Sequence, residues 1–407
     1  MRILLFPSSY APVIGGLQTV VQMLARSFKE QGHEVHVVTN RYPVALPARE
    51  TVDGVTVDRL LFLAPDFDYL RRGRLDLFGA SFFYGPQGYS RLKKVMRDFR
   101  PDVVNVHFPD HQIPFVLKLR REFDFGLVVS LHGHDVERAV NGHAIAGTDA
   151  SKRTTRALRN LRAILKEADA VTACSRDLLN KANQVEAIIA GKSRVIHNGI
   201  DPARFLEEEP YLHPRPYVLA LGRLTRTKGF DLLVEALAQH ESASKPDLII
   251  AGAGEEHEAL SGRVERLGLS RNIHFFGQAS PHEVVKLLNG CLCVVVPSRS
   301  ESFGIAALEA IAAGKPVLAT KIGGLEEFLN ELSESQTANG SRSTSQSHGH
   351  PSVVLVEPTV DGIARGLKQM FELTNGAKIR NGYRLPDKYT WPHVARSYER
   401  VLVRSRA

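Results

Sequence analysis

Two glutamates, Glu301 and Glu309, are the side chains whose type and spacing best suit chemistry. A carboxylate accepts hydrogen bonds from hydroxyl groups. Glu301 is expected in a loop and Glu309 about two turns along the following helix, which places them roughly 12 Å apart at 1.5 Å per residue. The pair could therefore hold hydroxyl groups at the two ends of one elongated ligand. The alternative is a loop carboxylate and a solvated helix face with no common ligand.

A strand and a helix must position this pair. The apolar, β-branched run 291–297, which ends in proline, predicts a buried strand. From Ser302 onward the apolar residues follow helical spacing, and Gly314 with Pro316 is expected to end the helix. The glutamates therefore flank a strand-to-helix turn.

The turn between the glutamates favours negative charge. Its backbone amides begin a helix, and amides at a helix start have no partner within the helix. Together with the helix dipole they favour a diphosphate. A carboxylate, an anion site and a second carboxylate in this order fit a nucleoside diphosphate-sugar. The residues that supply the amides are Ser302, Phe303, Gly304 and Ile305.

The segment 298–316 resembles the hallmark of the retaining glycosyltransferases of family 4, an E-x7-E motif in the second of two Rossmann-like domains. The resemblance runs from Met1 to about Arg404, apart from one insertion. It implies the GT-B fold, an α/β architecture with two parallel sheets that face each other across an interdomain cleft. Further segments that resemble family landmarks are 7–12, 15–19, 195–201, 221–229 and 251–254.

Composition and periodicity independently indicate a two-domain α/β protein. The 407 residues are 43% hydrophobic, and strand-like runs alternate with amphipathic helical segments in both halves. We place an acceptor-binding domain at 1–205 with a returning helix at 391–407, and a donor-binding domain at 206–390. The Ser- and Gly-rich stretch 333–352 is expected to be a disordered surface insertion, whose His348 and His350 could bind metal adventitiously. Strands are expected at 2–6, 34–39, 103–107, 127–131, 170–173, 217–221, 247–251, 273–276, 293–296, 317–319 and 353–356.

The net charge of +8 is confined to the N-terminal half. Residues 1–200 hold 28 Lys and Arg against 20 Asp and Glu, whereas residues 201–407 hold 24 of each sign. If that half binds the acceptor, as the resemblance implies, its field suits an anionic glycolipid or glycan precursor, or an anionic membrane surface. Solvated helix faces without a partner are the alternative. Nucleic acid is not expected, because no recognised binding motif appears and the basic stretches 71–74, 91–100 and 152–166 contain a single aromatic residue, Phe99.

Arg223 and Lys228 are the cations expected to stabilise a leaving diphosphate. Both follow the predicted strand 217–221, so both can point into the cleft. The resemblance implies that Gly222 and Gly252, each in a glycine turn after a strand, also contact the donor. Because the two cations can balance the diphosphate, no metal and no other cofactor is expected. An isolated Arg and Lys at this spacing would otherwise be surface charge.

The N-terminal half offers a glycine loop and a histidine. Gly15 and Gly16 precede a predicted amphipathic helix and let the backbone approach a donor closely, although an ordinary turn is the alternative. His132 follows a predicted strand and matches a family histidine near the reacting sugar, so the resemblance implies a catalytic role. A metal half-site with His134 or a helix cap by Asp135 are the alternatives here.

The sequence and the resemblance together predict transfer of a sugar from a nucleoside diphosphate-sugar to an acceptor hydroxyl, with retention of configuration implied by the resemblance. Glu309 would hold the ribose and Glu301 the donor sugar, domain closure would exclude water, and the departing phosphate would help deprotonate the acceptor. A nucleotide-sugar epimerase, an inverting transferase or a non-catalytic nucleotide-sugar-binding protein are the alternatives. Substrate choice is expected to depend on loops such as 41–65 and 71–89.

The chain is expected in the cytoplasm, with association at the inner face of the membrane as a further expectation. An odd number of cysteines, Cys174, Cys291 and Cys293, does not suggest a disulfide framework. The apolar run at the N-terminus is too short for a signal peptide, and no run near 18 apolar residues could span a bilayer.

Overall fold

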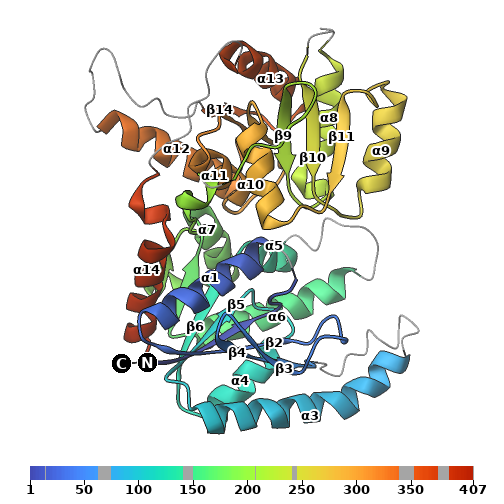
Figure 1. Cartoon of the computed structure of the whole chain (residues 1–407). Coiled ribbons are helices and arrows are strands. Elements are labelled where there is room, and N and C mark those ends of the chain that lie inside the picture. The colour runs from blue at the N-terminus through green and yellow to red at the C-terminus, as the bar shows by residue number, and fades with distance from the viewer. Residues whose placement is uncertain are drawn as a thin grey trace. The chain divides into compact units, whose positions relative to one another are not determined.

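The structure is a computed structural model that describes residues 1–13, 15–62, 75–140, 150–206, 208–240, 245–338, 353–374 and 385–406 (Figure 1). Contacts divide the chain into two compact units. The N-terminal unit comprises Met1–Gly199 and Trp391–Ala407, and the C-terminal unit comprises Ile200–Thr390. The sequence analysis placed the corresponding bounds at 205 and 391, and its acceptor-binding and donor-binding roles for the two units stay predictions. Each unit is described by itself below.

The described part of the N-terminal unit contains an eight-stranded sheet in the order β3-β4-β2-β1-β5-β6-β7-β8. Neighbouring strands pair in parallel except β3 and β4, which are antiparallel. β5 and β6 are buried throughout, which explains their nearly continuous apolar sequences. The strands are β1 (Arg2–Pro7), β2 (Glu34–Asn40), β3 (Arg49–Val52), β4 (Val55–Leu60), β5 (Val103–His107), β6 (Gly126–Leu131), β7 (Ala170–Ala173) and β8 (Ser193–Val195).

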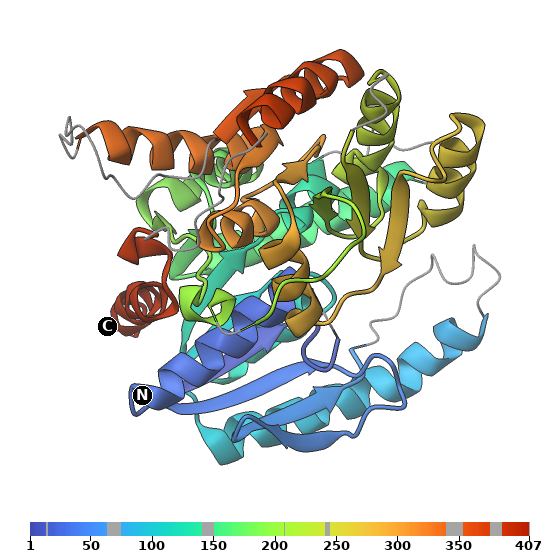
Figure 2. The ribbon, with the colours of Figure 1, turned by 45° about the horizontal axis from the view of Figure 1, so that its top comes forward.

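The helices of this unit bury one apolar face each. In α1 the residues Val20, Val21, Leu24 and Phe28 are buried, as their helical spacing predicted. The final helix α14 lies beside α1 in both views (Figures 1 and 2), so the end of the chain completes the N-terminal unit. The helices are α1 (Gly16–Glu30), α3 (Leu75–Phe99), α4 (Ile113–Glu122), α5 (His134–Val140), α6 (Ala150–Glu167), α7 (Arg176–Val185) and α14 (Trp391–Arg404), with the short η1 (Ala187–Gly191).

The C-terminal unit contains, among its described residues, a six-stranded parallel sheet in the order β11-β10-β9-β12-β13-β14. Its strands are β9 (Tyr217–Leu221), β10 (Asp247–Ala251), β11 (Ile273–Gly277), β12 (Val294–Val296), β13 (Val317–Thr320) and β14 (Val353–Val356). Its helices are α8 (Phe230–Ala238), α9 (His257–Arg266), α10 (Pro281–Gly290), α11 (Ile305–Ala312), α12 (Gly323–Ala338) and α13 (Val360–Thr374), with the short η2 (Pro202–Phe205), η3 (Arg226–Lys228) and η4 (Asp387–Tyr389).

Alternation along β9 shows how helices cover both faces of this sheet. Val218 and Ala220 belong to a core cluster with residues of α8, α9 and α13. The intervening residue Tyr217 points the other way, and its hydroxyl donates to the Leu287 carbonyl of α10 at 2.7 Å. α10 therefore covers the face opposite α8 and α13 (Figure 1).

The two sheets share one topology. Without the edge strands β3 and β8, the order in the N-terminal unit is third, second, first, fourth, fifth, sixth, and the C-terminal sheet has the same order. This order reverses between β1 and β5 in one unit and between β9 and β12 in the other. Ligands of open α/β sheets bind beyond the carboxyl ends of the strands at such reversal points. The loops after these four strands are therefore where functional residues are sought.

The two stretches expected to be substrate-selecting loops contain regular structure. Stretch 41–65 holds the hairpin β3–β4, which the sequence analysis missed because β3 alternates polar and half-exposed residues at a sheet edge. Stretch 71–89 is helical from Leu75, although Pro86 and several glycines made it look irregular. Gly88 has a packing role, since a Cβ there would lie 2.5 Å from the Leu61 carbonyl oxygen. Residues 63–74 lie outside the described residues.

The prediction that 333–352 is a disordered insertion is wrong for residues 333–338. Helix α12 continues to Ala338, and the Ser333 hydroxyl donates to the Leu329 carbonyl within that helix at 3.0 Å. A solvated helix needs no apolar face in its last turns, which is why composition alone misplaced the boundary. Residues 339–352, including His348 and His350, lie outside the described residues. The third missed strand, β8, has only three residues.

Three further expectations concern membrane contact and cysteines. Among the described residues no helix is long and apolar enough to cross a bilayer. Cys174, Cys291 and Cys293 are buried, and their thiols form no disulfide within the described residues. Among the described side chains of α3 and α6, these basic residues are exposed to solvent: Arg91, Lys94, Arg97, Arg159, Arg162 and Lys166.

Candidate active site

The loops after β9 and β12 bring Lys228 and Glu301 together. The Lys228 ammonium donates to the Glu301 Oε2 at 2.5 Å, although the residues are 73 positions apart in the chain. The side chains are 31% and 15% exposed, so the pair is accessible to a ligand. Because β9 and β12 flank the reversal point of the sheet, this ion pair lies where an open α/β sheet binds its ligand.

Backbone contacts fix the two loops against each other. Gly229 has φ +68°, and a Cβ at this position would overlap the Pro297 carbonyl oxygen. From the other loop, the amides of Arg299 and Ser300 donate to the Thr227 carbonyl at 2.7 and 3.3 Å. Lys228 and Glu301 are therefore held in register by their own backbones as well as by their charges.

A second ion pair, Asp231 with Arg299, ties the same two loops. The Arg299 guanidinium makes a two-pronged contact to the Asp231 carboxylate at 2.6 and 2.7 Å and also donates to the Arg226 carbonyl at 3.0 Å. Burial would raise the pKa of Asp231, but the hydrogen bonds and charge of Arg299 hold that pKa below its usual value. The sequence analysis missed this pair. Arg299 lies two residues before Glu301, but nothing local identifies a partner 68 residues away.

Arg223 is presented by a tight backbone arrangement. The Gly222 amide donates to the Ala251 carbonyl at 3.0 Å, and a Cβ on Gly252 would overlap the Gly222 carbonyl oxygen. Gly222 and Gly252 have φ of 147° and 151°, which other residues rarely adopt. Backbone conformation therefore explains both glycines and close packing also explains Gly252, while their contact with a donor stays a prediction. The Arg223 side chain is exposed, and its guanidinium has no hydrogen bond or ion pair within the described part of the chain.

The helix that carries Glu309 starts at Ile305, three residues later than Ser302. Gly304 precedes it with φ 94°, no side chain caps it, and a Cβ on Gly304 would lie 2.5 Å from Leu325 Cδ1. The first amides of α11 have no acceptor within the helix, as in any α-helix. Phe303 is buried and its ring packs on Phe328 with centroids 4.9 Å apart, so only its backbone is available to a ligand.

Glu309 pairs with a residue that the sequence analysis did not select. The guanidinium of Arg204 in η2 lies 3.6 Å from Glu309 Oε1, and the two side chains are 29% and 19% exposed. Burial raises the pKa of Glu309, while the charge of Arg204 lowers it. Arg204 lies at the very end of the predicted acceptor-binding domain 1–205, where no local signal marks it as a site residue. The structure thus joins Lys228 to Glu301 and Glu309 to Arg204.

In the N-terminal unit, Gly15 and Gly16 follow β1 and begin α1. Gly15 is extended, with φ 169°, a conformation that any residue adopts. A Cβ on Gly15 would meet only the far end of the Gln18 side chain. The Gly15 carbonyl accepts from the amide and hydroxyl of Thr19 at 3.0 and 3.2 Å. No backbone packing demands glycine at position 15, unlike Gly252.

His132 follows β6 and contacts a second histidine. The Nε2 of His132 lies 3.1 Å from the Nδ1 of His107, the last residue of β5, and the rings stack with centroids 5.4 Å apart. Burial lowers the pKa of His132 to about 4 and lowers that of His107 well below its usual value. Both rings are therefore neutral near pH 7. His107 was missed, although a histidine at the end of a buried strand is a usable signal.

The neighbouring Asp135 lies in the first turn of α5, inside the helix and not at its cap. Its carboxylate accepts from the backbone amides of His132, Gly133 and Val136 at 3.0, 2.7 and 3.0 Å. Burial raises the pKa of Asp135 to about 6 against these hydrogen bonds. His134 is exposed and its ring stacks on Phe108 instead. The metal half-site considered for His134 is not formed by these side chains.

Comparison with known proteins covers nearly the whole chain. The family model "Glycosyltransferase Family 4" matches residues 14–204, and the model "Glycosyl transferases group 1" matches residues 203–341. A relative, glycogen synthase of Mycobacterium tuberculosis, is 30% identical over 345 residues, which is 81% of this chain and 80% of that protein.

Two solved structures share the fold. Sucrose-phosphate synthase from Thermosynechococcus elongatus aligns with a TM-score of 0.72 at 21% identity, over 98% of each chain. Anabaena HepE, in complex with UDP and glucose, aligns with a TM-score of 0.70 at 18% identity, over 99% of this chain and 100% of that one. These neighbours have the GT-B fold, as expected from the sequence. Together with the family matches, they show that the chain is a nucleotide-sugar-dependent glycosyltransferase of family 4.

Proposed function

We propose that this enzyme transfers a sugar with retention of anomeric configuration, from a nucleoside diphosphate-sugar held by the C-terminal unit. The observation that carries the proposal is the Lys228–Glu301 ion pair at the reversal point of the sheet. An ammonium group has three donors, so Lys228 can keep Glu301 in place while it also donates to a phosphate oxygen. Glu301 retains a second carboxylate oxygen for hydroxyl groups of the donor sugar.

The diphosphate would be held by Lys228, Arg223 and the first amides of α11. The guanidinium of Arg223 is exposed, and within the described residues it is committed to no other group. The helix start adds oriented amides and a favourable dipole. These groups would stabilise the negative charge that develops on the leaving diphosphate, which is the largest requirement of the reaction. In this proposal no metal is needed to balance that charge.

Glu309 would receive the ribose hydroxyls. Its carboxylate is mostly buried beside Arg204, which keeps a positive charge close to it. Arg204 would favour the ionised form of Glu309, the form that accepts hydrogen bonds from both hydroxyls of a ribose. This role makes Arg204 a positioning residue that acts through Glu309.

The acceptor hydroxyl would be handled by neutral groups of the N-terminal unit. His132 is neutral near pH 7 and lies at the carboxyl edge of its sheet, as do Gly15 and Gly16. A neutral imidazole can exchange hydrogen bonds with a hydroxyl without adding charge. The departing phosphate would take the acceptor proton, so no protein base is assigned. The excess positive charge of residues 1–200 supports an anionic acceptor, such as a glycolipid or glycan precursor, or an anionic membrane surface.

Donor turnover tests the assignment of the site. We expect acceptor-dependent release of nucleoside diphosphate by the wild-type enzyme, and at least a 100-fold loss of kcat/KM in Glu301→Gln and Arg223→Ala. Glu258→Gln and Arg266→Ala, which change exposed residues of α9, are the matched controls and should retain activity. Full activity in both site variants would overturn the proposed site. An inverted anomeric product, read by NMR, would overturn retention.

A thermal-shift screen identifies the donor base. HepE was solved with UDP and glucose, so UDP-glucose is the first donor to test, followed by GDP- and ADP-sugars. A ligand at 100 times its Kd adds about 2.7 kcal/mol to the free energy of unfolding. The shift should be lost in Glu309→Ala if this residue holds the ribose.

A further inference from the structure

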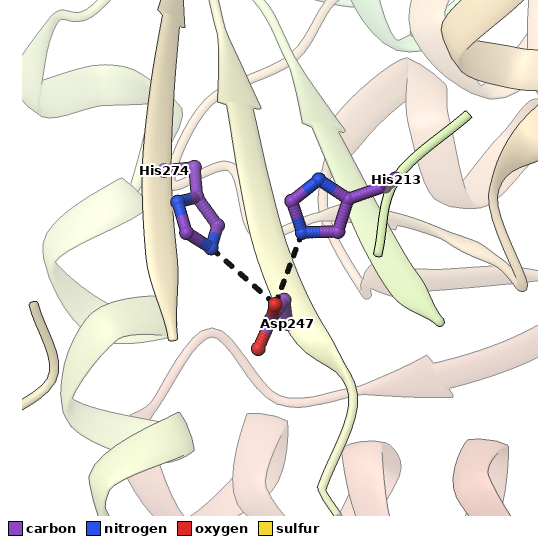
Figure 3. Close-up of side chains that lie close together, drawn as sticks. All are labelled: His213, Asp247 and His274. Carbon is purple, nitrogen blue, oxygen red and sulfur yellow. Dashed lines mark hydrogen bonds and ion pairs between the residues drawn. The ribbon is translucent and has the colours of Figure 1, made fainter. Parts of the chain in front are cut away.

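Three metal-ligating side chains gather at the amino end of the C-terminal sheet. Figure 3 shows the rings of His213 and His274 pointing at the carboxylate of Asp247. Asp247 is the first residue of β10, His274 is the second residue of β11, and His213 lies in the segment that leads to β9. Lys228 and Glu301 lie beyond the carboxyl ends of the strands. The three side chains of this cluster lie at the amino ends of the same sheet.

The spacing of the three ligand atoms is close to what a metal ion needs. The Nε2 atoms of His213 and His274 lie 3.0 and 3.4 Å from the same oxygen, Asp247 Oδ2. One ligand atom from each residue lies within 4.8 Å of the others. In a tetrahedral site with bonds of about 2.0–2.1 Å, ligand atoms are separated by roughly 3.3 Å. His274 is 40% exposed and free to adjust, whereas His213 is 13% exposed and fixed.

The surroundings orient Asp247 as a ligand through one oxygen. Its side chain is 3% exposed, and its other oxygen, Oδ1, receives the Asn272 amide at 3.3 Å and lies 3.5 Å from the Arg215 guanidinium. Arg215 is itself anchored on the Lys245 carbonyl at 2.6 Å. Partners that hold the non-ligating atoms of a carboxylate are typical of metal sites. Oδ2 is left for the two imidazoles.

We propose that His213, Asp247 and His274 bind one divalent transition-metal ion, with Zn²⁺ as the best match. Two imidazoles and a carboxylate are ligands that suit Zn²⁺, and a water molecule would fill the fourth position. In the proposed site each imidazole binds as the neutral ring and the carboxylate as the anion. The ion replaces the two hydrogen bonds at Oδ2 with coordinate bonds, and each imidazole moves its Nε2 proton to Nδ1, or releases it to solvent if the ring was charged.

This metal has a structural role. It joins β10 and β11 to the segment that enters the C-terminal unit, through three residues distant in sequence. Catalysis at the carboxyl edge needs no contribution from it. The proposal is therefore independent of the proposed sugar transfer, and each can fail without the other.

Metal binding is tested on the full-length enzyme, freed of any affinity tag and treated with EDTA. Titration with ZnCl₂ should give one ion per chain by calorimetry, and CoCl₂ should produce visible absorption bands typical of tetrahedral coordination. Zn²⁺ should also raise the Tm by several degrees. Donor turnover should be equal before and after EDTA treatment.

Variants show whether Zn²⁺ binds at this cluster or at other histidines of the chain. His274→Ala changes a half-exposed ring and should fold normally yet lose Zn²⁺ binding by at least 100-fold, and Asp247→Asn should lose it as well. His282→Ala is the matched control, because His282 pairs with the single carboxylate of Glu208 and is 83% exposed. It should bind Zn²⁺ like the wild type. The same holds for His348→Ser with His350→Ser.

Two outcomes would overturn the proposal. Equal Zn²⁺ affinity in the wild type and in His274→Ala would show that the ion binds elsewhere. Absence of Zn²⁺ or Co²⁺ binding by a folded wild-type chain would show that the three side chains form only a hydrogen-bonded cluster.

Discussion

The two units place different chemistry beyond the carboxyl ends of their central strands. In the C-terminal unit these loops carry charge: Lys228 pairs with Glu301, and Asp231 pairs with Arg299 beside it. In the N-terminal unit β5 ends in His107 and β6 is followed by His132; burial lowers the pKa values of both, so both rings are neutral near pH 7. One sheet order thus supports a charged site and an uncharged one.

This difference follows from the loops and not from the sheets. Strand order only decides which loops become neighbours. A charged loop end suits a diphosphate, whose negative charge must be balanced as it leaves. Neutral imidazoles suit a hydroxyl group, which carries no charge until it reacts. The fold is therefore shared while function depends on a few loop residues.

The largest effect is expected from Lys228→Ala. Removing a cation that stabilises the leaving diphosphate should lower kcat/KM by about 10²–10³. Lys286→Ala is the control, since Lys286 is 47% exposed on α10 of the same unit. Steady-state kinetics of donor turnover measure both. An unchanged kcat/KM in Lys228→Ala would show that the charge of Lys228 does not contribute to the reaction.

Substitution of two glycines, one in each unit, is expected to have the next largest effect. Gly252→Ala should destabilise the enzyme by about 3 kcal/mol, because a Cβ would overlap the Gly222 carbonyl oxygen. Gly15→Ala should cost less than about 1 kcal/mol, since Gly15 is extended and a Cβ would meet only a flexible side chain. Urea unfolding measures both variants. If Gly15→Ala is stable but inactive, Gly15 serves a ligand.

Arg299→Ala tests whether the second ion pair positions the first. It leaves Asp231 half-buried without its partner, so we expect a loss of about 2 kcal/mol in the free energy of unfolding and about tenfold in kcat. The pKa of Asp231 is lowered in the folded state, so the pair stabilises above the usual carboxyl range and this contribution disappears on acidification. Arg299→Ala should therefore show less acid sensitivity than the wild type. Equal acid sensitivity would contradict a stabilising role.

His132→Gln probes the uncharged site through its pH dependence. The pKa of His132 falls from 6.5 to about 4 on folding, so the unfolded chain binds the proton more strongly between these values. Lowering the pH from 7.5 to 5 should thus cost the wild type about 2 kcal/mol through this residue, and His132→Gln should lack this loss. Fluorescence of Trp391, the single tryptophan, reports unfolding of the N-terminal unit. His134→Gln, at an exposed ring, should follow the wild type.

Strands with strong local patterns were predictable, and short or more polar strands were not. β5, β7, β9, β10 and β14 have the predicted bounds, because parallel strands with buried residues carry mostly apolar runs. β3, β4 and β8 were missed, since β3 alternates polar residues, β4 contains Asp58 and Arg59, and β8 has three residues. Helix α3 was missed because Pro86 and its glycines are local signals for a loop, while its packing is tertiary.

For the candidate site, the functional residues could be selected from the sequence, but the residues that they contact could not. Glu301 and Lys228 were selected separately, and only the adjacency of β9 and β12 shows that they pair. Arg204, His107 and the Asp231–Arg299 pair escaped because each depends on a contact between distant segments. Gly252 was selected as a donor contact, whereas the structure also gives it a packing reason that sequence cannot show.

The return of α14 to the N-terminal unit bears on how the chain is made. Trp391 packs so closely on Gly199 that a Cβ at position 199 would lie 2.6 Å from the indole. The N-terminal unit is thus completed by residues 391–407, which follow the C-terminal unit in the sequence. On a ribosome, the residues of the C-terminal unit are synthesised before those of α14. The unit whose synthesis starts first is therefore completed later, and a truncation that removes α14 would damage the N-terminal unit.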